Sequence, residues 1–339
     1  MRVLLAEDSA VVREYLVYIL SQNPQIEVVG TAKDGIEAVE KAEQLRPNLV
    51  LMDAHMPRMN GFEATRKIME VAPTPIVMIS ASLEADATAI TFEAIKAGAL
   101  TMVEKPAGPG HPAEAEMVTR LLETVRLMAE VKVVRRWART ERKTPSVPPP
   151  RNVRLVVMGA STGGPAALGE IVQLLPPTLQ VPILVVQHIT PGFTVGLVQW
   201  LRRETPLPLK MAEPLEVVRP GTVYLAPEGA HMGITRAGRI HLTKGTPGEG
   251  YCPSVNHLFE SVALSYGHAA MGVLLTGMGQ DGAAGLLKLR QAGGVTIAQD
   301  EETSAVFGMP AEAIRLGAAE LVLSTRDIAE TIKKYVSFR

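Results

Sequence analysis

The chain of 339 residues lacks several features, and each absence excludes a class of protein. It contains one cysteine, Cys252, which rules out an internal disulfide framework and suits a reducing cytoplasm. No segment approaches the roughly 18 consecutive apolar residues that a membrane-spanning helix needs, and the apolar run at the N-terminus is too short for a signal peptide. The formal net charge of −1 gives no general basis for binding nucleic acid. We therefore expect a cytoplasmic protein that neither inserts into a membrane nor binds nucleic acid.

The composition is that of a globular protein large enough for two domains. Hydrophobic residues make up 47% of the chain and charged residues 20%, and this length exceeds what one ordinary core holds. From 112 to about 139 apolar residues recur at helical spacing, and prolines then gather over 144–150. We expect a first domain over 1–125, a helical and proline-rich linker over 126–152, and a second domain over 153–339.

The first domain alternates strand-like and helix-like segments. Buried strand patterns lie at 3–6, 26–32, 48–52, 76–79 and 100–103, and helical patterns lie at 9–21, 35–45, 61–71 and 85–97. This β/α alternation predicts a doubly wound, five-stranded parallel sheet of the flavodoxin-like kind. In such a sheet the ligand site lies at the carboxyl ends of the strands.

Charged and hydroxyl side chains stand at those predicted strand ends. Glu7 and Asp8 follow the first strand, Asp53 follows the third, Ser80 the fourth and Lys105 the fifth. Three carboxylates in one pocket repel one another unless a divalent cation lies among them, and oxygen ligands suit Mg²⁺. The lysine and the hydroxyl would then contact a phosphoryl group built on one carboxylate, which is known carboxylate chemistry.

These positions resemble the receiver domain of two-component response regulators over about residues 1–125. The motifs that match are Glu7-Asp8, Leu51-Met-Asp-Ala-His-Met-Pro57, Met59-Asn-Gly61, Ser80 and Lys105-Pro106. The resemblance implies that Asp53 is the phosphoacceptor and that Glu7, Asp8 and Asp53 hold Mg²⁺. It also implies that Ser80 is the switch hydroxyl and that Lys105 contacts the phosphoryl group.

Two details of the fifth strand qualify the resemblance. The family usually carries an aromatic switch residue three positions before the lysine, whereas this chain has Met102. Coupling from phosphorylation to the domain surface is therefore expected to differ in detail. The Lys105–Pro106 bond is expected to be cis, which would suit a tight turn.

The second domain opens with an apolar strand pattern over 153–158 that ends in Gly159-x-Ser161-x-Gly163. Small residues around a serine allow a sharp turn that exposes the hydroxyl, as in a nucleophile elbow. The same glycines could instead cradle a phosphate in a dinucleotide-binding domain. Against that alternative, no tyrosine has a lysine four residues on, and the next strand ends in His188 rather than in an acid for the ribose.

Partners for a nucleophilic serine follow two later strand patterns. His188 comes directly after the strand over 183–187, and Asp281 lies in a glycine-rich loop after the strand over 271–276. A histidine can take the serine proton while a carboxylate holds its tautomer. The backbone N–H groups of 277–279 are placed to form an oxyanion hole. The order Ser, His, Asp differs from that of the α/β-hydrolases.

These three motifs together resemble the catalytic domain of the chemotaxis protein-glutamate methylesterases over about residues 153–336, an α/β domain with a mostly parallel sheet. The resemblance implies Ser161 as nucleophile, His188 as general base and acid, Asp281 as the orienting acid and Met278 as a backbone oxyanion donor. Thr162 is a weaker site candidate.

That family resemblance implies a phosphorylation-activated hydrolase. Its substrates would be methyl esters of glutamate on the cytoplasmic helices of chemoreceptors, with deamidation of receptor glutamines in many members. A chemotaxis histidine kinase would be the phosphodonor, Mg²⁺ the cofactor of the receiver, and the esterase would need no cofactor. The receiver is expected to cover part of a shallow active-site cleft until Asp53 is phosphorylated.

Two other functions remain open. The receiver could control a non-catalytic binding module, or the second domain could be an NAD(P)-dependent dehydrogenase. Three further histidines, His231, His257 and His268, lack ligand spacing and are expected to be surface or packed residues. Cys252 has no base at readable spacing, so a catalytic thiol is not expected.

Overall fold

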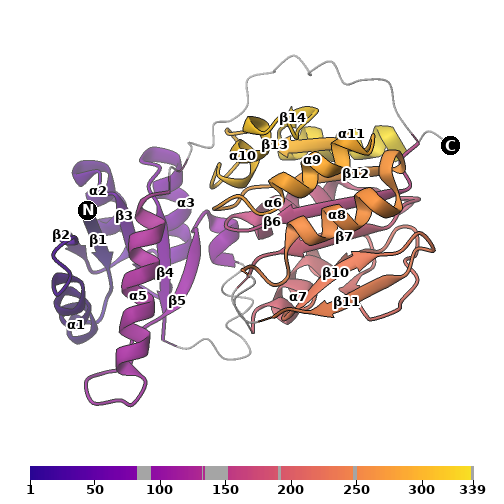
Figure 1. Ribbon diagram of the computed structural model, residues 1–339. Coiled ribbons are helices and arrows are strands. Elements are labelled where there is room, and N and C mark those ends of the chain that lie inside the picture. The colour runs from indigo at the N-terminus through magenta and orange to yellow at the C-terminus, as the bar shows by residue number, and fades with distance from the viewer. Residues whose placement is uncertain (82–92, 132, 134–151, 190–191, 247–249, 337–339) are drawn as a thin grey trace. The chain divides into compact units, whose positions relative to one another are not determined.

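The computed structural model describes residues 1–81, 93–131, 133, 152–189, 192–246 and 250–336. The chain divides into two compact units, Met1–Ala138 and Arg139–Arg339 (Figure 1). Each unit has its own sheet and its own buried core. The predicted boundaries of the linker, 126 and 152, stay predictions, because most of that segment lies outside the described residues.

The first unit contains a five-stranded parallel sheet, as the β/α alternation predicted. Its strands lie in the order β2-β1-β3-β4-β5. The strands are β1 (Arg2–Ala6), β2 (Glu27–Ala32), β3 (Leu49–Asp53), β4 (Ile76–Ser80) and β5 (Thr101–Glu104). The helices are α1 (Ala10–Ser21), α2 (Gly35–Leu45), α3 (Gly61–Val71) and α5 (Glu114–Ala129). Of the helix predicted over 85–97, the described residues 93–97 are helical.

Side-chain caps begin three of these helices close to the sheet's carboxyl edge. The side chains of Ser9 and Asp34 accept hydrogen bonds from backbone amides of α1 and α2. Asn60 forms a reciprocal capping box with Glu63 at the start of α3. These caps satisfy amides that the helix itself leaves without acceptors. The loops that hold the strand-end residues therefore run directly into ordered helix starts.

The helix α5 is shorter than its apolar repeat predicted. The repeat indicated a helix from 112 to about 139, but α5 ends at Ala129. Val131 is buried beyond the helix end, and Val133 packs against the core of the first unit. These β-branched residues have low helix propensity, which favours an end to the helix before them. Residues 134–139 of the predicted helix lie outside the described residues.

The second unit contains a seven-stranded sheet in the order β14-β13-β12-β6-β7-β9-β8, with every neighbouring pair parallel. Its strands are β6 (Leu155–Ala160), β7 (Ile183–Gln187), β8 (Leu209–Met211), β9 (Val223–Leu225), β12 (Ala270–Leu274), β13 (Val295–Gln299) and β14 (Leu321–Leu323). A separate antiparallel hairpin joins β10 (Ala230–Ile234) to β11 (Ile240–Lys244). The predicted α/β domain with a mostly parallel sheet is confirmed.

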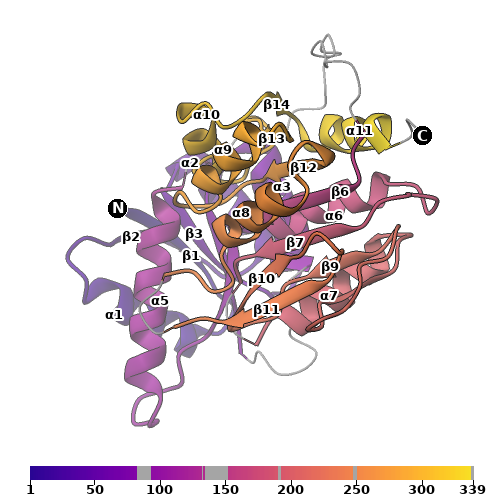
Figure 2. The same cartoon turned by 45° about the vertical axis from the view of Figure 1, so that its right-hand side comes forward.

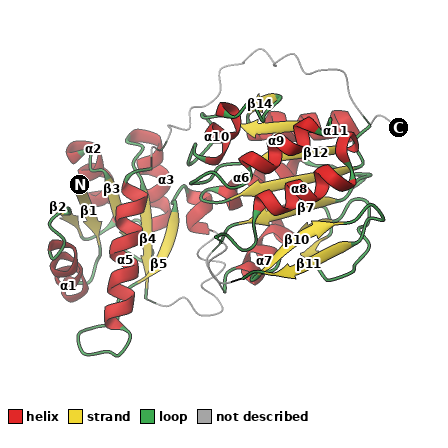
Figure 3. Cartoon of the chain, viewed as in Figure 1, coloured by secondary structure: helices red, strands yellow, loops and turns green. Residues whose placement is uncertain are grey.

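Helices cover both faces of this sheet (Figure 3). They are α6 (Gly164–Leu174), α7 (Thr194–Glu204), α8 (Val255–Ser265), α9 (Ala283–Gln291), α10 (Met309–Arg315) and α11 (Thr325–Val336), with a short 3-10 turn at Gly267–Ala269. One hydrophobic core joins residues of β6 and β7 to α8, α9 and the hairpin on one face (Figure 2). Helices α6, α7 and α11 pack together on the other face.

The strand β6 lies between β12 and β7 in the middle of the sheet. All three strands run in the same direction, so the loops that follow them leave from one edge. No helix among the described residues is long and apolar enough to cross a membrane.

Candidate functional site

The first unit brings three carboxylates together at the carboxyl edge of its sheet. One oxygen from each of Glu7, Asp8 and Asp53 lies within 4.8 Å of the others. Glu7 and Asp53 are buried and Asp8 is exposed. The Lys105 ammonium reaches into the cluster, 2.8 Å from Glu7 Oε2 and 3.0 Å from Asp53 Oδ1. Sequence reasoning predicted this juxtaposition from the strand ends.

The charges in this cluster are incompletely balanced. Burial and the neighbouring charge of Asp53 raise the pKa of Glu7, although Lys105 opposes the shift. Burial lowers the pKa of Lys105, but its bonds to Glu7 and Asp53 outweigh burial and raise that pKa. One lysine therefore faces several carboxylates. An oxygen-only set with excess negative charge and one solvent-facing carboxylate fits the needs of Mg²⁺.

Ser80 and Met102 lie on the last two strands of this sheet. Ser80 ends β4 and is buried, and its carbonyl accepts a hydrogen bond of 2.8 Å from Lys105 N. Met102 is buried in the core of the first unit. The expectation of a cis bond at Lys105–Pro106 is wrong, because the cis bond of the described residues is Cys252–Pro253. The chain leaves β5 without a tight turn over 105–108, so the trans form, which is preferred for most bonds to proline, suffices.

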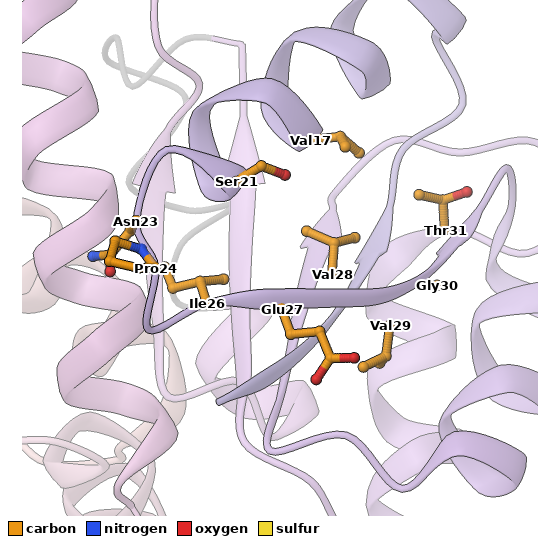
Figure 4. Close-up of a pocket in the computed structure, with 10 residues that line it drawn as sticks. All are labelled: Val17, Ser21, Asn23, Pro24, Ile26, Glu27, Val28, Val29, Gly30 and Thr31. Carbon is orange, nitrogen blue, oxygen red and sulfur yellow. The ribbon is translucent and has the colours of Figure 1, made fainter.

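A pocket of about 480 Å³ lies elsewhere in the first unit, between α1 and the edge strand β2 (Figure 4). Apolar side chains and Glu27 line it, together with Ser21, Asn23 and Thr31. None of the strand-end candidates is among its lining residues. This pocket is therefore separate from the acidic cluster.

In the second unit Ser161, His188 and Asp281 lie at the carboxyl edge of the sheet. Ser161 follows β6, His188 follows β7, and Asp281 lies in the loop after β12. Two backbone hydrogen bonds extend the strand pairing to this edge. Ser161 N donates to Thr276 O at 3.0 Å, and His188 N donates to Ala160 O at 2.9 Å. The parallel order of the strands therefore gathers these three residues.

Asp281 holds the imidazole and is itself firmly held. His188 Nε2 lies 2.9 Å from Asp281 Oδ2, and both side chains are nearly buried. Asp281 also accepts hydrogen bonds from Ser254 Oγ at 3.0 Å and from the amides of Val255 at 2.7 Å and Asn256 at 3.0 Å. The carboxylate thus receives four donors.

These donors keep Asp281 ionised. Burial raises its pKa, but the hydrogen bonds from His188 and from the amides of Asn256 and Val255 outweigh burial, and the pKa is lowered. Those two amides are the first of α8, where the helix dipole also favours a negative charge. Sequence reasoning missed this contribution of α8. The signal was present in Pro253-Ser254 ahead of an apolar run, which is typical of a helix start.

The other ring nitrogen, His188 Nδ1, is buried and has no hydrogen-bond partner among the described residues. Ser161 and His188 thus share the edge without a hydrogen bond between their side chains. Hydrogen bonds of catalytic groups are often long without substrate and shorten when it binds. Because Nε2 is engaged by Asp281, Nδ1 is the nitrogen available to a serine proton.

The loop after β12 approaches Ser161 closely. A Cβ on Gly277 would lie 2.6 Å from Ser161 Cβ and 2.3 Å from Met309 Sδ, so only glycine fits. Gly277 O accepts hydrogen bonds from Gly308 N and Met309 N, which fix the loop. Across the described part of the chain, Met278 N–H makes no hydrogen bond with the protein. It is therefore free to donate to a bound oxyanion.

Three neighbouring residues complete this edge, and only one of them, Thr162, was a site candidate from the sequence. Gln187 Nε2 donates to Ser161 O at 2.7 Å and holds the turn that carries the serine. Thr162 contributes its carbonyl, which accepts from Thr276 Oγ1 at 2.9 Å. Tyr251 stacks on His188, with ring centroids 4.3 Å apart. Gln187 ends β7 directly before His188, and Tyr251 stands outside the sequence motifs. Neither was predicted to have a role of its own, because their contacts depend on the fold.

A shallow groove of about 520 Å³ begins at Tyr251. It continues between the loop after β12 and the helix α10. The lining residues are Tyr251, Gly279, Gln280, Phe307, Gly308, Ala311, Glu312 and Arg315. Arg315 donates two hydrogen bonds of 2.7 Å to Glu312 within it. Ser161 is not among these lining residues; Tyr251, which stacks on His188, connects the groove to the candidate site.

The remaining histidines pack or face solvent. His231 and His257 stack with ring centroids 5.0 Å apart, and His241 meets His257 edge-on at 6.2 Å. His231 Nδ1 also accepts a hydrogen bond from Ser254 N. His268 is exposed. The expectation that His231, His257 and His268 are packed or surface residues agrees with this arrangement.

Comparison with known families matches both units of the chain. The family described as CheB methylesterase matches residues 156–332, and the response regulator receiver domain matches residues 3–115. The methylesterase match covers more than half of the chain.

Curated relatives match almost the whole chain. A "Protein-glutamate methylesterase/protein-glutamine glutaminase" of Nitrosospira multiformis is 49% identical, covering 99% of this chain and 97% of that protein. A relative of the same description from Syntrophus aciditrophicus is 47% identical, covering 98% and 97%. Among solved structures, the CheB methylesterase catalytic domain of Thermotoga maritima is 40% identical, with a TM-score of 0.51, covering 54% of this chain and 99% of that chain.

Proposed function

The chain belongs to the CheB methylesterase family, and on that premise we propose that it removes methyl esters from glutamate side chains of chemoreceptors. We further propose that it deamidates receptor glutamines and that phosphorylation of Asp53 activates it. The observation that carries the proposal is the His188–Asp281 pair of 2.9 Å at the sheet edge that also holds Ser161. The chain would act in the cytoplasm, where the substrate helices lie.

In the first step Ser161 Oγ attacks the carbonyl carbon of the glutamyl ester. His188 Nδ1 takes the hydroxyl proton as the new C–O bond forms. The tetrahedral intermediate carries its negative charge on the former carbonyl oxygen, and Met278 N–H donates to it. When the intermediate collapses, the bond to the methoxy oxygen breaks, His188 returns the proton, and methanol leaves.

In the second step water resolves the acyl-enzyme. His188 removes a proton from the water, whose oxygen attacks the acyl carbon. Collapse of the second intermediate returns the proton to Ser161 and releases the glutamate carboxyl group. With a glutamine substrate the same steps release ammonia instead of methanol.

Asp281 makes this cycle possible through its charge. Its lowered pKa keeps it ionised, so it stabilises the imidazolium that forms in each step. Its bonds to the start of α8 hold the carboxylate in place. The imidazole therefore meets a fixed negative charge on one side, with Nδ1 directed away from it.

The first unit would supply the control. Asp53 accepts the phosphoryl group from a chemotaxis histidine kinase, and Glu7, Asp8 and Asp53 are the residues that would hold Mg²⁺. Bound there, the ion would neutralise charge on the phosphoryl oxygens. Lys105, now bonded to Glu7 and Asp53, would pair with the new phosphoryl group, and Ser80 on the adjacent strand would donate its hydroxyl to it.

We also propose that the unphosphorylated receiver restrains the esterase. The support is the pairing of a receiver domain with a methylesterase domain in one chain. Beryllofluoride, a phosphoryl mimic, should therefore raise the esterase rate of the wild type and leave Asp53→Ala unchanged. Equal stimulation of both proteins, or of neither, would contradict the control.

The esterase activity itself is tested by release of radiolabelled methanol from methylated receptor membranes. Wild type should release label, and Ser161→Ala should lose at least about a thousandfold of the rate. A serine-directed fluorophosphonate should label the wild type at Ser161. An unlabelled protein without esterase activity would instead favour a binding module, and protection from thermal unfolding by a dinucleotide would favour a dehydrogenase.

A further inference from the structure

We propose that Tyr251 is a positioning residue of the esterase, which fixes the plane of the His188 ring and stabilises that ring when it takes up a proton. The inference rests on the proposed function, in which His188 is the general base. It adds a residue that lies in neither the serine, the histidine nor the glycine-loop motif.

The contact between the two rings is a parallel stack. Their centroids are 4.3 Å apart and their planes differ by 4°. Tyr251 is 51% exposed, whereas the His188 side chain is 8% exposed. An aromatic side chain with this much solvent contact therefore covers one face of a nearly buried imidazole.

The stacked tyrosine and the carboxylate restrict different motions of the imidazole ring. Asp281 binds one nitrogen at the edge of the ring, which leaves the ring able to tilt about that hydrogen bond. A parallel neighbour at van der Waals distance blocks the tilt. Together the two contacts fix the direction in which His188 Nδ1 points. General-base catalysis requires this orientation, because the nitrogen must face the proton that it accepts.

Tyr251 is anchored by the segment that also holds the carboxylate. Three residues on, Ser254 donates its hydroxyl to Asp281 and its amide to His231 Nδ1. At its other end, the Tyr251 hydroxyl faces the glycine loop, since a Cβ on Gly279 would lie 3.4 Å from it. The ring thus extends from His188 to the residue next to Met278, the proposed oxyanion donor.

The stack should strengthen during the reaction. His188 is neutral when it accepts the serine proton and cationic afterwards, and a cation over an aromatic face is attracted by the ring. An interaction that is stronger in the transition state than in the ground state accelerates the chemical step. Typical cation–π strengths predict an effect of about threefold to thirtyfold on kcat.

Kinetics of three full-length variants test the proposal. Tyr251→Leu removes the aromatic ring, Tyr251→Phe keeps it, and Tyr18→Leu makes the same change at a 63% exposed tyrosine of α1. Substrates are the small ester p-nitrophenyl acetate and methylated receptor membranes. We expect Tyr251→Leu to lose about threefold to thirtyfold in kcat on both substrates with little change in KM. Tyr251→Phe and Tyr18→Leu should stay within about twofold of wild type.

Three results would overturn the proposal. Unchanged kcat of Tyr251→Leu on the small ester would mean that the ring does not act through His188. A change confined to KM for receptor membranes would make Tyr251 only a wall of the substrate groove. Failure of Tyr251→Phe to retain the rate would transfer the role to the hydroxyl group.

An NMR measurement tests the stack without any assay of activity. In protein with isotope-labelled histidine, the His188 ring signal is assigned by its loss in His188→Gln. The ring current of a stacked tyrosine shields that signal, so Tyr251→Leu should move it downfield while the signal of exposed His268 stays in place. An unmoved His188 signal would refute the stack. If Ser161→Ala retained full esterase activity, the proposed function would fail, whereas this NMR result would still stand on its own.

Discussion

Each unit has a buried carboxylate after a parallel strand, but the pKa of this carboxylate is shifted in opposite directions in the two units. Burial raises the pKa of both Glu7 and Asp281. Around Asp281 every close polar neighbour is a donor, and the net effect is a lowered pKa. Around Glu7 the Ser9 amide and Lys105 are donors, but Asp53 is another carboxylate, and the net effect is a raised pKa.

This difference indicates how each site is used. A carboxylate whose acceptors are all satisfied is locked, which suits a group that must hold an imidazole through a reaction cycle. A carboxylate in a cluster with too few donors keeps unsatisfied acceptor oxygens. Such a group is suited to a site that must bind a cation and a phosphoryl group. The burial is similar, so the surrounding donors decide the electrostatic outcome.

Asp281→Asn should have the largest effect on this comparison. Loss of the charge leaves the imidazolium unsupported and permits the wrong tautomer, so we expect kcat to fall about a thousandfold to ten-thousandfold. The variant should also be less stable at neutral pH by about 1 to 3 kcal/mol, because charged hydrogen bonds at the start of α8 are weakened.

The difference in the free energy of unfolding between wild type and Asp281→Asn should depend on pH, and the direction follows from the pKa shift. The folded pKa of Asp281 is lowered below its ordinary value of 3.8, so the carboxylate stabilises the fold above that value. This contribution is lost as pH falls through the lower folded pKa. In denaturant unfolding, wild type should therefore be more stable than Asp281→Asn at pH 7. This difference in the free energy of unfolding should become smaller below about pH 4. Asp300→Asn, which alters a carboxylate bonded to Thr303, serves as the control and should leave kcat near that of wild type.

Gly277→Ala should have the next largest effect. Its new Cβ would collide with Met309 Sδ and with Ser161 Cβ, so the loop or the serine must move. We expect a tenfold to hundredfold loss of kcat, since displacements of about 1 Å at a reacting group cost this much, and a loss of stability of about 1 to 3 kcal/mol. Gly108→Ala, which meets nothing within 4 Å, is the matched control. Wild-type kinetics in Gly277→Ala would show that the close approach is not needed for catalysis.

Lys105→Met tests whether the acidic cluster of the first unit lacks positive charge. Removing the ammonium group from between Glu7 and Asp53 leaves the carboxylates with no internal cation. We expect Mg²⁺ to bind severalfold more tightly by calorimetry, because the lysine no longer repels it, and beryllofluoride to lose its effect on the esterase rate. Lys67→Met removes a lysine from an exposed pair with Glu70 and should change neither quantity. Unaltered Mg²⁺ affinity in Lys105→Met would contradict a cluster short of positive charge.

Glu7→Gln should have the smallest effect of these variants. It should change the free energy of unfolding in the direction opposite to that of Asp281→Asn. The folded pKa of Glu7 is raised above its ordinary value of 4.5, so ionised Glu7 destabilises the fold once the pH rises through that range. In chelator at pH 7 the variant should be as stable as wild type or more stable, by up to about 1 kcal/mol. The difference should vanish below about pH 4 in denaturant unfolding. A clear loss of stability at pH 7 would break the contrast between the two units.

Much of the fold was predictable because its signals are local and repeated. Short apolar runs alternating with amphipathic segments predict parallel sheets in both units, and the observed strands agree. The helix α5 was predicted too long, because periodicity cannot report that Val131 is buried beyond its end. The bond at Lys105–Pro106 was predicted cis, because the sequence does not reveal whether the chain turns there.

The candidate site divides along the same line. Ser161, His188 and Asp281 could be named because each directly follows a strand or its glycine loop, and parallel strands bring such positions to one edge. Gln187, Tyr251 and the start of α8 could not be assigned roles. Their partners are distant in sequence, and no spacing rule connects Tyr251 with His188 or Ser254 with Asp281.

The sequence by itself determined which chemical groups stand at the two sheet edges, since strand periodicity and direction place them there. Only the tertiary structure decided what those groups experience. The pKa of Asp281 is lowered by amides that α8 presents, His188 Nε2 is engaged by that carboxylate, and Tyr251 covers the imidazole. Electrostatic environment and ring orientation depend on short-range contacts between distant segments, and only packing brings those segments together.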